Sequence, residues 1–195
     1  MNAELTCYCD NVMQISYPEH YNLSKNPGVK DEILSGSFMN FTCSKCGTLL
    51  KPEFPFTLDY PEKDIKISFV PEIEHDALLQ NEKKVEAGRS IVCGFNELYE
   101  LIQAVEQGLN KDALEAVKYG LLIKAPESEN IHSQFNSKEA DTLQFYIHGL
   151  KANEVGVVRV SLETYTKILE NLPEIRENEP YKSFLSGAYH SVSKI

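Results

Sequence analysis

The chain has 195 residues, 42% of them apolar and 10% aromatic, which is enough for one or two domains with a hydrophobic core. Its formal net charge of −10 opposes nucleic-acid phosphates, and 11 acids stand against six lysines even within residues 1–74. The start carries no apolar signal segment, and no run approaches the roughly 20 apolar residues of a membrane span. We therefore expect a cytoplasmic protein with no nucleic-acid and no membrane partner.

The N-terminal part is predicted to be mostly β structure. Residues 5–17 mix β-favouring side chains with two cysteines, which indicates short extended segments around a tight turn. Helical spacing predicts a short helix over 28–35. Residues 38–60 indicate strand, knuckle and strand, and residues 65–69 alternate apolar and polar side chains, which predicts a hairpin.

A pair of helices is predicted in the middle of the chain, after a charged segment over 72–89 that we interpret as a linker or an exposed helix. Asn96 is the expected N-cap of the first helix, in which Leu98, Leu101, Ile102 and Val105 recur at helical spacing. Gly108 ends that helix. Asn110 starts the second, which stops before Pro126.

The last third of the chain returns to a strand pattern. Residues 127–141 are polar and are predicted to form a surface loop. Residues 142–148 and 155–162 predict a hairpin. Ser161 is then a candidate N-cap for one more helix, which ends at Pro173, and residues 176–195 have no clear pattern.

These elements predict an α+β fold: a zinc-ribbon-like β N-terminal part, a helical pair, and a C-terminal β-hairpin plus helix. We place a zinc-binding domain over residues 1–125. Residues 126–195 form a C-terminal α/β extension that either completes the same fold or makes a small second unit.

Four of the five cysteines form two close pairs, Cys7 with Cys9 and Cys43 with Cys46, separated by 33 residues. Zinc prefers a tetrahedron of soft ligands, and thiols in a reducing cytoplasm stay free or bind metal. Closing the intervening loop costs roughly 3 kcal/mol. A structural zinc ion contributes about 10–16 kcal/mol, so the metal outweighs the loop. We therefore predict one structural Zn²⁺ bound by these four cysteines.

Other states of these thiols remain open at the level of sequence. The alternatives are iron or an iron–sulfur cluster, and thiols that are unligated or joined in disulfides. A catalytic zinc ion is disfavoured, because such sites keep an open position that four thiolates would fill. The tight Cys7-Tyr8-Cys9 pair reaches one metal only if Tyr8 turns outward and the chain bends at Asp10-Asn11.

The residues around the cysteines resemble a known family. The N-terminal Cys-x-Cys is followed by Asn22-Leu23-Ser24-Lys25-Asn26-Pro27, Ile33-Leu34-Ser35-Gly36, Phe41-Thr42-Cys43-Ser44-Lys45-Cys46-Gly47 and Val70-Pro71. This pattern is similar to the CpXC domain family, best over residues 4–72 and more loosely to residue 125. Ser44 replaces the proline that is usual in the family. The resemblance implies a zinc site at the four cysteines and carries no established activity.

Cys93 is the candidate for an enzymatic role, because it precedes a predicted helix N-terminus that would stabilise a thiolate. The competing interpretation is a small buried core residue between Val92 and Phe95. The favoured function is a binding or interaction module with a structural zinc ion, compatible with a protein partner. The alternative is an enzyme that uses Cys93 as nucleophile, or a metal-assisted hydrolase.

Overall fold

The computed structural model describes residues 1–80, 85–126 and 131–195, and it divides the chain into two compact units, Met1–Tyr99 and Glu100–Ile195. The division falls inside a helix. The predicted domain boundary between residues 125 and 126 lies elsewhere in the chain and stays a prediction. Within the described residues, no helix is both long enough and apolar enough to cross a membrane.

Unit 1 (Met1–Tyr99) is built on a four-stranded sheet and two small hairpins. Its elements are β1 (Asn2–Thr6), β2 (Val12–Ser16), β3 (His20–Asn22), α1 (Pro27–Ser35), β4 (Phe41–Thr42), β5 (Leu49–Leu50), β6 (Phe56–Tyr60), β7 (Ile65–Val70), α2 (His75–Leu79), β8 (Ser90–Cys93) and the start of α3 (Gly94–Glu106). The sheet order is β3-β6-β7-β8. Its central β6–β7 pair is antiparallel, and both outer pairs are parallel.

Aromatic side chains fill the core of unit 1. The Phe56 ring stacks on Phe69 with 4.5 Å between ring centroids, and Phe69 stacks on Phe95 at 5.1 Å. Phe38 contacts Phe56 and Tyr21 edge to face, at 5.5 and 5.2 Å. These geometries are the favoured ones for ring pairs, so the sheet and the segment after α1 share one core.

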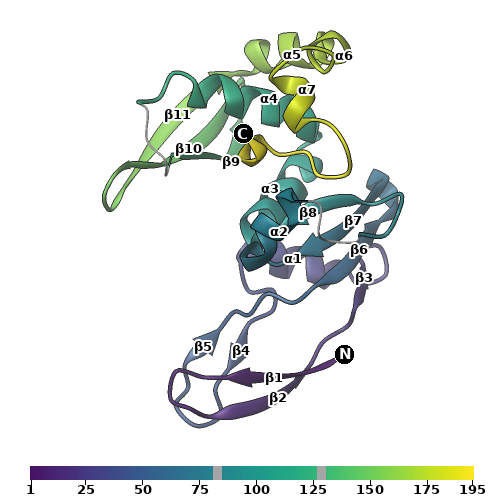
Figure 1. Ribbon diagram of the computed structural model, residues 1–195, viewed down its shortest axis with the longest axis vertical. Helices are drawn as coiled ribbons and strands as arrows, with labels where there is room; N and C mark the ends of the chain where they lie inside the picture. The colour runs from purple at the N-terminus through teal and green to yellow at the C-terminus, as the bar shows by residue number, and fades with distance from the viewer. Residues whose placement is uncertain (81–84, 127–130) are drawn as a thin grey trace. The chain divides into compact units, whose positions relative to one another are not determined.

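The two hairpins, β1–β2 and β4–β5, lie side by side (Figure 1) and form sheets separate from the four-stranded one. In the first hairpin Asn2 pairs with Ser16 and Thr6 with Val12. The second is only two residue pairs long. Two-stranded hairpins are marginally stable alone in water, so something else must hold this part of unit 1 together.

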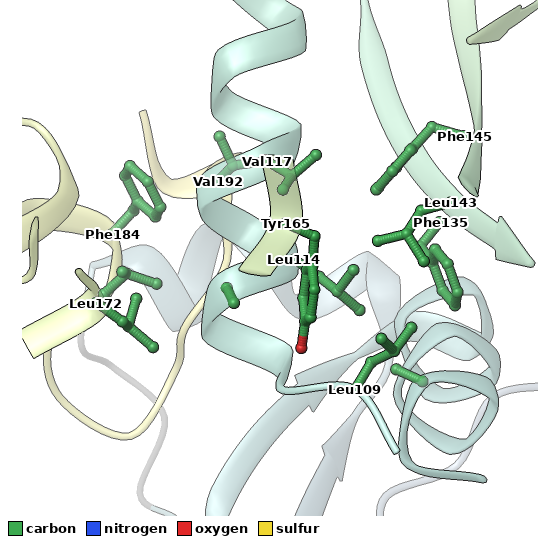
Figure 2. Packing of buried hydrophobic residues seen from close by; sticks show 13 residues of the cluster. Leu109, Leu114, Val117, Phe135, Leu143, Phe145, Tyr165, Leu172, Phe184 and Val192 are labelled. Atoms are coloured by element: carbon green, nitrogen blue, oxygen red, sulfur yellow. The ribbon is translucent and has the colours of Figure 1, made fainter. Parts of the chain in front are cut away.

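Unit 2 (Glu100–Ile195) contains the end of α3, helices and a three-stranded sheet of order β11-β10-β9. Its elements are α4 (Lys111–Leu122), β9 (His132–Glu139), β10 (Thr142–Lys151), β11 (Glu154–Ser161), α5 (Leu162–Glu170), α6 (Leu172–Ile175) and α7 (Tyr181–Phe184). Figure 2 shows Leu114 and Val117 of α4 facing Phe135, Leu143 and Phe145 of the sheet, in one buried cluster.

The α+β fold class is confirmed. So are the first hairpin, the helix before Gly36, the β6–β7 hairpin, the helical pair α3 and α4, the β10–β11 hairpin and the helix after it. Asn110 caps α4 by accepting the Ala113 N–H at 3.0 Å, and Ser161 caps α5 by accepting the Thr164 N–H at 3.2 Å. The charged segment over 72–89 contains the short helix α2, and its residues 81–84 lie outside the described residues.

Two predictions about elements are wrong. Residues 132–139 form the strand β9 and not a loop. Ser133 and Phe135 are buried on one face of this strand, and their polar neighbours lie on the other face. Residues 127–130 lie outside the described part of the chain. Asn96 does not cap α3, which begins at Gly94. Two carboxylates accept hydrogen bonds from backbone N–H groups at the start of that helix: Glu97 from the Cys93 N–H at 3.0 Å, and Glu53 from the Phe95 N–H at 2.9 Å.

Candidate metal centre

The four predicted cysteines come together at the ends of the two hairpins. Their sulfur atoms all lie within 4.8 Å of one another. Cys7 Sγ is 3.5 Å from Cys46 Sγ, and Cys9 Sγ is 3.8 Å from Cys43 Sγ. A tetrahedron with metal–sulfur bonds of about 2.3 Å has edges of about 3.8 Å. The four sulfurs are therefore spaced as ligands of one ion, and the cluster could hold a metal.

The first pair is set by a tight turn. Cys7 N–H donates to the Asn11 carbonyl at 2.9 Å, and Asp10 N–H donates to the Cys7 carbonyl at 2.9 Å. Asp10 adopts a left-handed conformation, with φ of 63°. Tyr8 points away and is 92% exposed. Both conditions for bringing Cys7 and Cys9 to one point, an outward Tyr8 and a bend at Asp10-Asn11, are met.

The second pair lies on a knuckle closed by Gly47. Cys43 N–H donates to the Thr48 carbonyl at 2.8 Å, and Gly47 N–H donates to the Cys43 carbonyl at 2.9 Å. Gly47 has φ of 76°, a conformation that glycine adopts without steric cost.

The knuckle also stabilises thiolates. The Cys46 amide aimed at the Cys43 sulfur is the largest cause that lowers the pKa of Cys43, to about 6; burial opposes it, and the Lys45 amide adds to it. The Thr48 side chain and amide lower the pKa of Cys46. Because metals bind the thiolate form, these groups prepare the Cys43 and Cys46 sulfurs for a cation. The Cys9 amide lowers the pKa of Cys7, but burial and the neighbouring thiols outweigh it and raise that pKa to about 12, and the pKa of Cys9 is raised as well.

The Asn11 side chain also supports the site, a role beyond the bend at Asp10-Asn11 that the sequence indicated. The Asn11 side-chain amide donates to Cys43 Sγ at 3.6 Å and to the Ser44 hydroxyl at 3.3 Å. It thereby links the turn of one hairpin to the knuckle of the other. The only sequence signal was its position, directly after the bend at Asp10, where Asn is a common turn residue.

Little else holds the two hairpins together. Their buried cluster consists of Cys7, Cys43 and Leu50, with Leu5, Cys9 and Met13 packed partly buried against it. Cys46 is exposed and all four thiols are free of disulfides. So small an apolar core contributes little, and a bound ion would supply most of the stabilisation of this region.

Cys93 lies away from this cluster, at the end of β8, and is buried. Burial, followed by the nearby carboxylates of Glu97 and Glu53, raises its pKa to about 12. A thiol with so high a pKa stays protonated at neutral pH and is a poor nucleophile. The surroundings of Cys93 thus fit a core residue better than a catalytic one.

A family model described as "CpXC protein" matches residues 5–118, which is more than half of the chain and includes all four clustered cysteines. The chain belongs to the CpXC family. As a CpXC protein it is similar to an uncharacterized protein of Treponema pallidum (strain Nichols), with 21% identity over 214 residues that cover 98% of this chain and 97% of that protein. No solved structure matches the chain.

For this CpXC chain, the family and the cysteine cluster together indicate metal binding. The family match ends at residue 118, within α4. The relative, by contrast, aligns over nearly the whole chain, so it also covers the sheet of unit 2.

Proposed function

We propose that the chain is a zinc protein in which Cys7, Cys9, Cys43 and Cys46 bind one structural Zn²⁺. The observation that carries this proposal is the mutual distance of at most 4.8 Å among the four sulfurs, drawn from two hairpins that share almost no apolar core. Zinc bound by four thiolates is a closed tetrahedral site. The ion would fix the two hairpins as one rigid body.

The sulfur spacing also bears on which metal group the site takes. Iron–sulfur clusters distribute their cysteines over several iron atoms, which separates the sulfurs more widely than a single ion does. A single iron ion has the same geometric needs as zinc. Elemental analysis and the visible absorption of the purified protein separate the two, because zinc is colourless and has no redox chemistry.

We further propose that the zinc-bearing hairpins act as a binding module for a protein partner in the cytoplasm. Three apolar side chains are exposed there: Tyr8 at 92%, Leu49 at 60% and Val12 at 56%. Tyrosine is enriched at protein interfaces, and hairpins fixed by a metal present such side chains with little loss of entropy on binding. The net charge of −10 favours protein over nucleic acid as the partner.

The enzymatic alternative rests on Cys93 as a nucleophile or on hydrolysis at the metal. The raised pKa of Cys93 opposes the first route. The second requires an open coordination position, which four thiolates would not leave. A binding role is therefore the better supported of the two.

Elemental analysis of the full chain, purified without added metal, tests the zinc assignment. We expect about one zinc per chain, as for a single closed site. Cys43→Ser should lower this ratio substantially, whereas Cys93→Ser, the matched control, should leave it unchanged. A metal-free chain whose two hairpins are nevertheless folded, judged by NMR of residues 1–16 and 41–50, would refute the assignment.

Affinity capture tests the binding role. The zinc-loaded chain and a Tyr8→Ser variant with an unchanged zinc content are compared for recovery of the same protein from an extract. We expect Tyr8→Ser to reduce recovery of a partner by tenfold or so, the effect of losing a buried aromatic anchor. Equal recovery by both chains would contradict a partner at this surface.

A further inference from the structure

Unit 1 also contains a pocket, and none of the four clustered cysteines lines it. It is an open pocket of about 420 Å³ between the end of β2, β3 and the segment that follows α1. That volume lies within the range of small-molecule sites. Four aromatic residues are among those that line it: Tyr17, Tyr21, Phe38 and Phe41. The first three are buried and held by ring contacts, Tyr17 by stacking on Phe54 at 4.6 Å, so these walls are preformed.

Some acceptors of this pocket lack a strong donor, although the Ser16 and Ser37 hydroxyls and the Asn40 NH2 group in the lining can donate. The Asn40 side-chain oxygen is buried and accepts no hydrogen bond. The Tyr21 hydroxyl donates to Met39 Sδ at 4.0 Å, and the Tyr17 hydroxyl donates to Met1 Sδ at 3.4 Å. Donating to these weak acceptors leaves both phenol oxygens able to accept. A ligand rich in N–H donors would complement this lining.

The charge of the lining has one sign. Among the described residues that line the pocket, Glu32 is the only charged one, and none is Lys or Arg. In the part of the chain that the structure describes, its carboxylate makes no ion pair. The Glu32 carboxylate lies near enough to the Tyr21 phenol to act on it electrostatically, second to burial among the causes that raise the pKa of Tyr21 to about 12. Aromatic faces also attract cations.

Backbone strain lies at the same place. Met39, which is buried and lines the pocket, has φ of 57° although it is not glycine. Such conformations occur where the surroundings enforce them, often at binding sites. Here the strained residue precedes Asn40, whose oxygen is the unsatisfied one. That oxygen is buried, so a ligand donor would reach it only after the Asn40 amide turned about its soft terminal torsion.

We propose that this pocket binds a small organic cation, a primary ammonium carried on an apolar body. The ammonium would lie between the Glu32 carboxylate and the Asn40 oxygen, and the apolar body would contact the aromatic walls. Three N–H donors then meet the acceptors of the lining, and the positive charge meets the single acid. None of the four clustered cysteines lines the pocket, but Ser16 of β2 and Phe41 of β4 do, so this site extends the function proposed above and rests on it for the fold of the two hairpins.

Titration of the zinc-loaded full chain with phenethylammonium tests this proposal by NMR. We expect saturable shifts of signals from Tyr17, Phe38 and Phe41 at millimolar ligand. 2-Phenylethanol has the same shape without the charge, and phenylacetate reverses the charge. Both should bind at least tenfold more weakly, because hydrogen bonds that involve a charged group are worth more than neutral ones.

Two variants locate the ammonium. Glu32→Gln should weaken phenethylammonium binding about tenfold, as expected for loss of a charge-assisted hydrogen bond. Asp31→Asn changes the same charge on the neighbouring residue of α1, which does not line the pocket, and should leave the affinity within twofold. Equal binding of the alcohol, equal effects of the two variants, or no saturable shift for any probe would overturn the proposal.

Discussion

The ammonium of Lys118 lies 2.8 Å from Glu100 Oε1, with both side chains buried in the centre of unit 2. Glu115 Oε1 contacts the same ammonium, also at 2.8 Å. The second carboxylate oxygen of each acid accepts a backbone hydrogen bond: Glu100 Oε2 from the Phe135 N–H at 2.9 Å, and Glu115 Oε2 from the Val192 N–H at 2.8 Å. One lysine thus connects α3, α4, β9 and the C-terminal segment.

Replacing Lys118 with methionine should destabilise unit 2 by about 3–5 kcal/mol. The cause is that two buried carboxylates lose their counter-charge while remaining out of water. Urea denaturation followed by circular dichroism measures the loss. Lys167→Met is the matched control, because Lys167 pairs with Glu163 at 2.6 Å on the exposed face of α5, where such pairs contribute about 0–1 kcal/mol. Similar losses in the two variants would contradict a central role for Lys118.

Tyr165→Phe should lower the free energy of unfolding by about 1–2 kcal/mol. The Tyr165 hydroxyl accepts the Asn110 N–H at 2.8 Å, and phenylalanine leaves that partly buried donor without its acceptor. Tyr8→Phe is the control, since Tyr8 is 92% exposed and should change stability by less than about 0.5 kcal/mol. Denaturant titrations of both variants give the comparison, and an unaffected Tyr165→Phe chain would count against the bond.

Cys43→Ser should destabilise the hairpins more than Cys93→Ser destabilises the sheet. Loss of one of four ligands removes much of a metal's contribution, whereas a buried thiol exchanged for a hydroxyl loses packing and gains a polar group to satisfy. Thermal melts, with NMR signals assigned to the hairpins and to β8, separate the two regions. The reverse order of melting temperatures would argue against the proposed ligands.

Cys93 should make the protein less stable at alkaline pH. Its pKa is about 12 when folded, against 9.0 for a free thiol, so unfolding above pH 9 releases a proton. Stability therefore falls as pH rises from about 9 towards 12, because the unfolded chain binds fewer protons. In Cys93→Ala this contribution is absent, and urea midpoints at pH 8 and pH 10 should differ less than in the wild type. An equal difference would exclude Cys93 as a source.

The sequence predicted the parts of the fold that depend on short-range patterns. Asn110 and Ser161 mark the starts of helices through local chemistry, and both were placed correctly. The cysteine pairs were also informative, because two close pairs of soft ligands are typical of a metal site. Their proximity in the structure agrees with that interpretation, while binding itself stays a prediction.

The failures involve partners distant in sequence. The start of α3 is capped by Glu53, 42 residues away from Phe95, which no local rule identifies. β9 was not predicted because its sequence lacks an alternation of apolar and polar residues. Only Ser133 and Phe135 are buried, and their neighbours Gln134 and Asn136 are polar. Residues 176–195 lack periodicity, yet Phe184 and Val192 are buried in the core of unit 2, against α4 and its neighbours. Their fold is set by the surface they cover.

The hydrogen bond between Val192 and Glu115 spans 77 positions of the chain. During synthesis the chain emerges from its N-terminal end, so Glu115 and Lys118 leave the ribosome well before Val192 exists. Until Val192 has been synthesised, Glu115 Oε2 lacks its hydrogen-bond donor in the folded unit. Unit 1 can therefore complete its sheet as it emerges, whereas the core of unit 2 is complete only once Val192 has been synthesised.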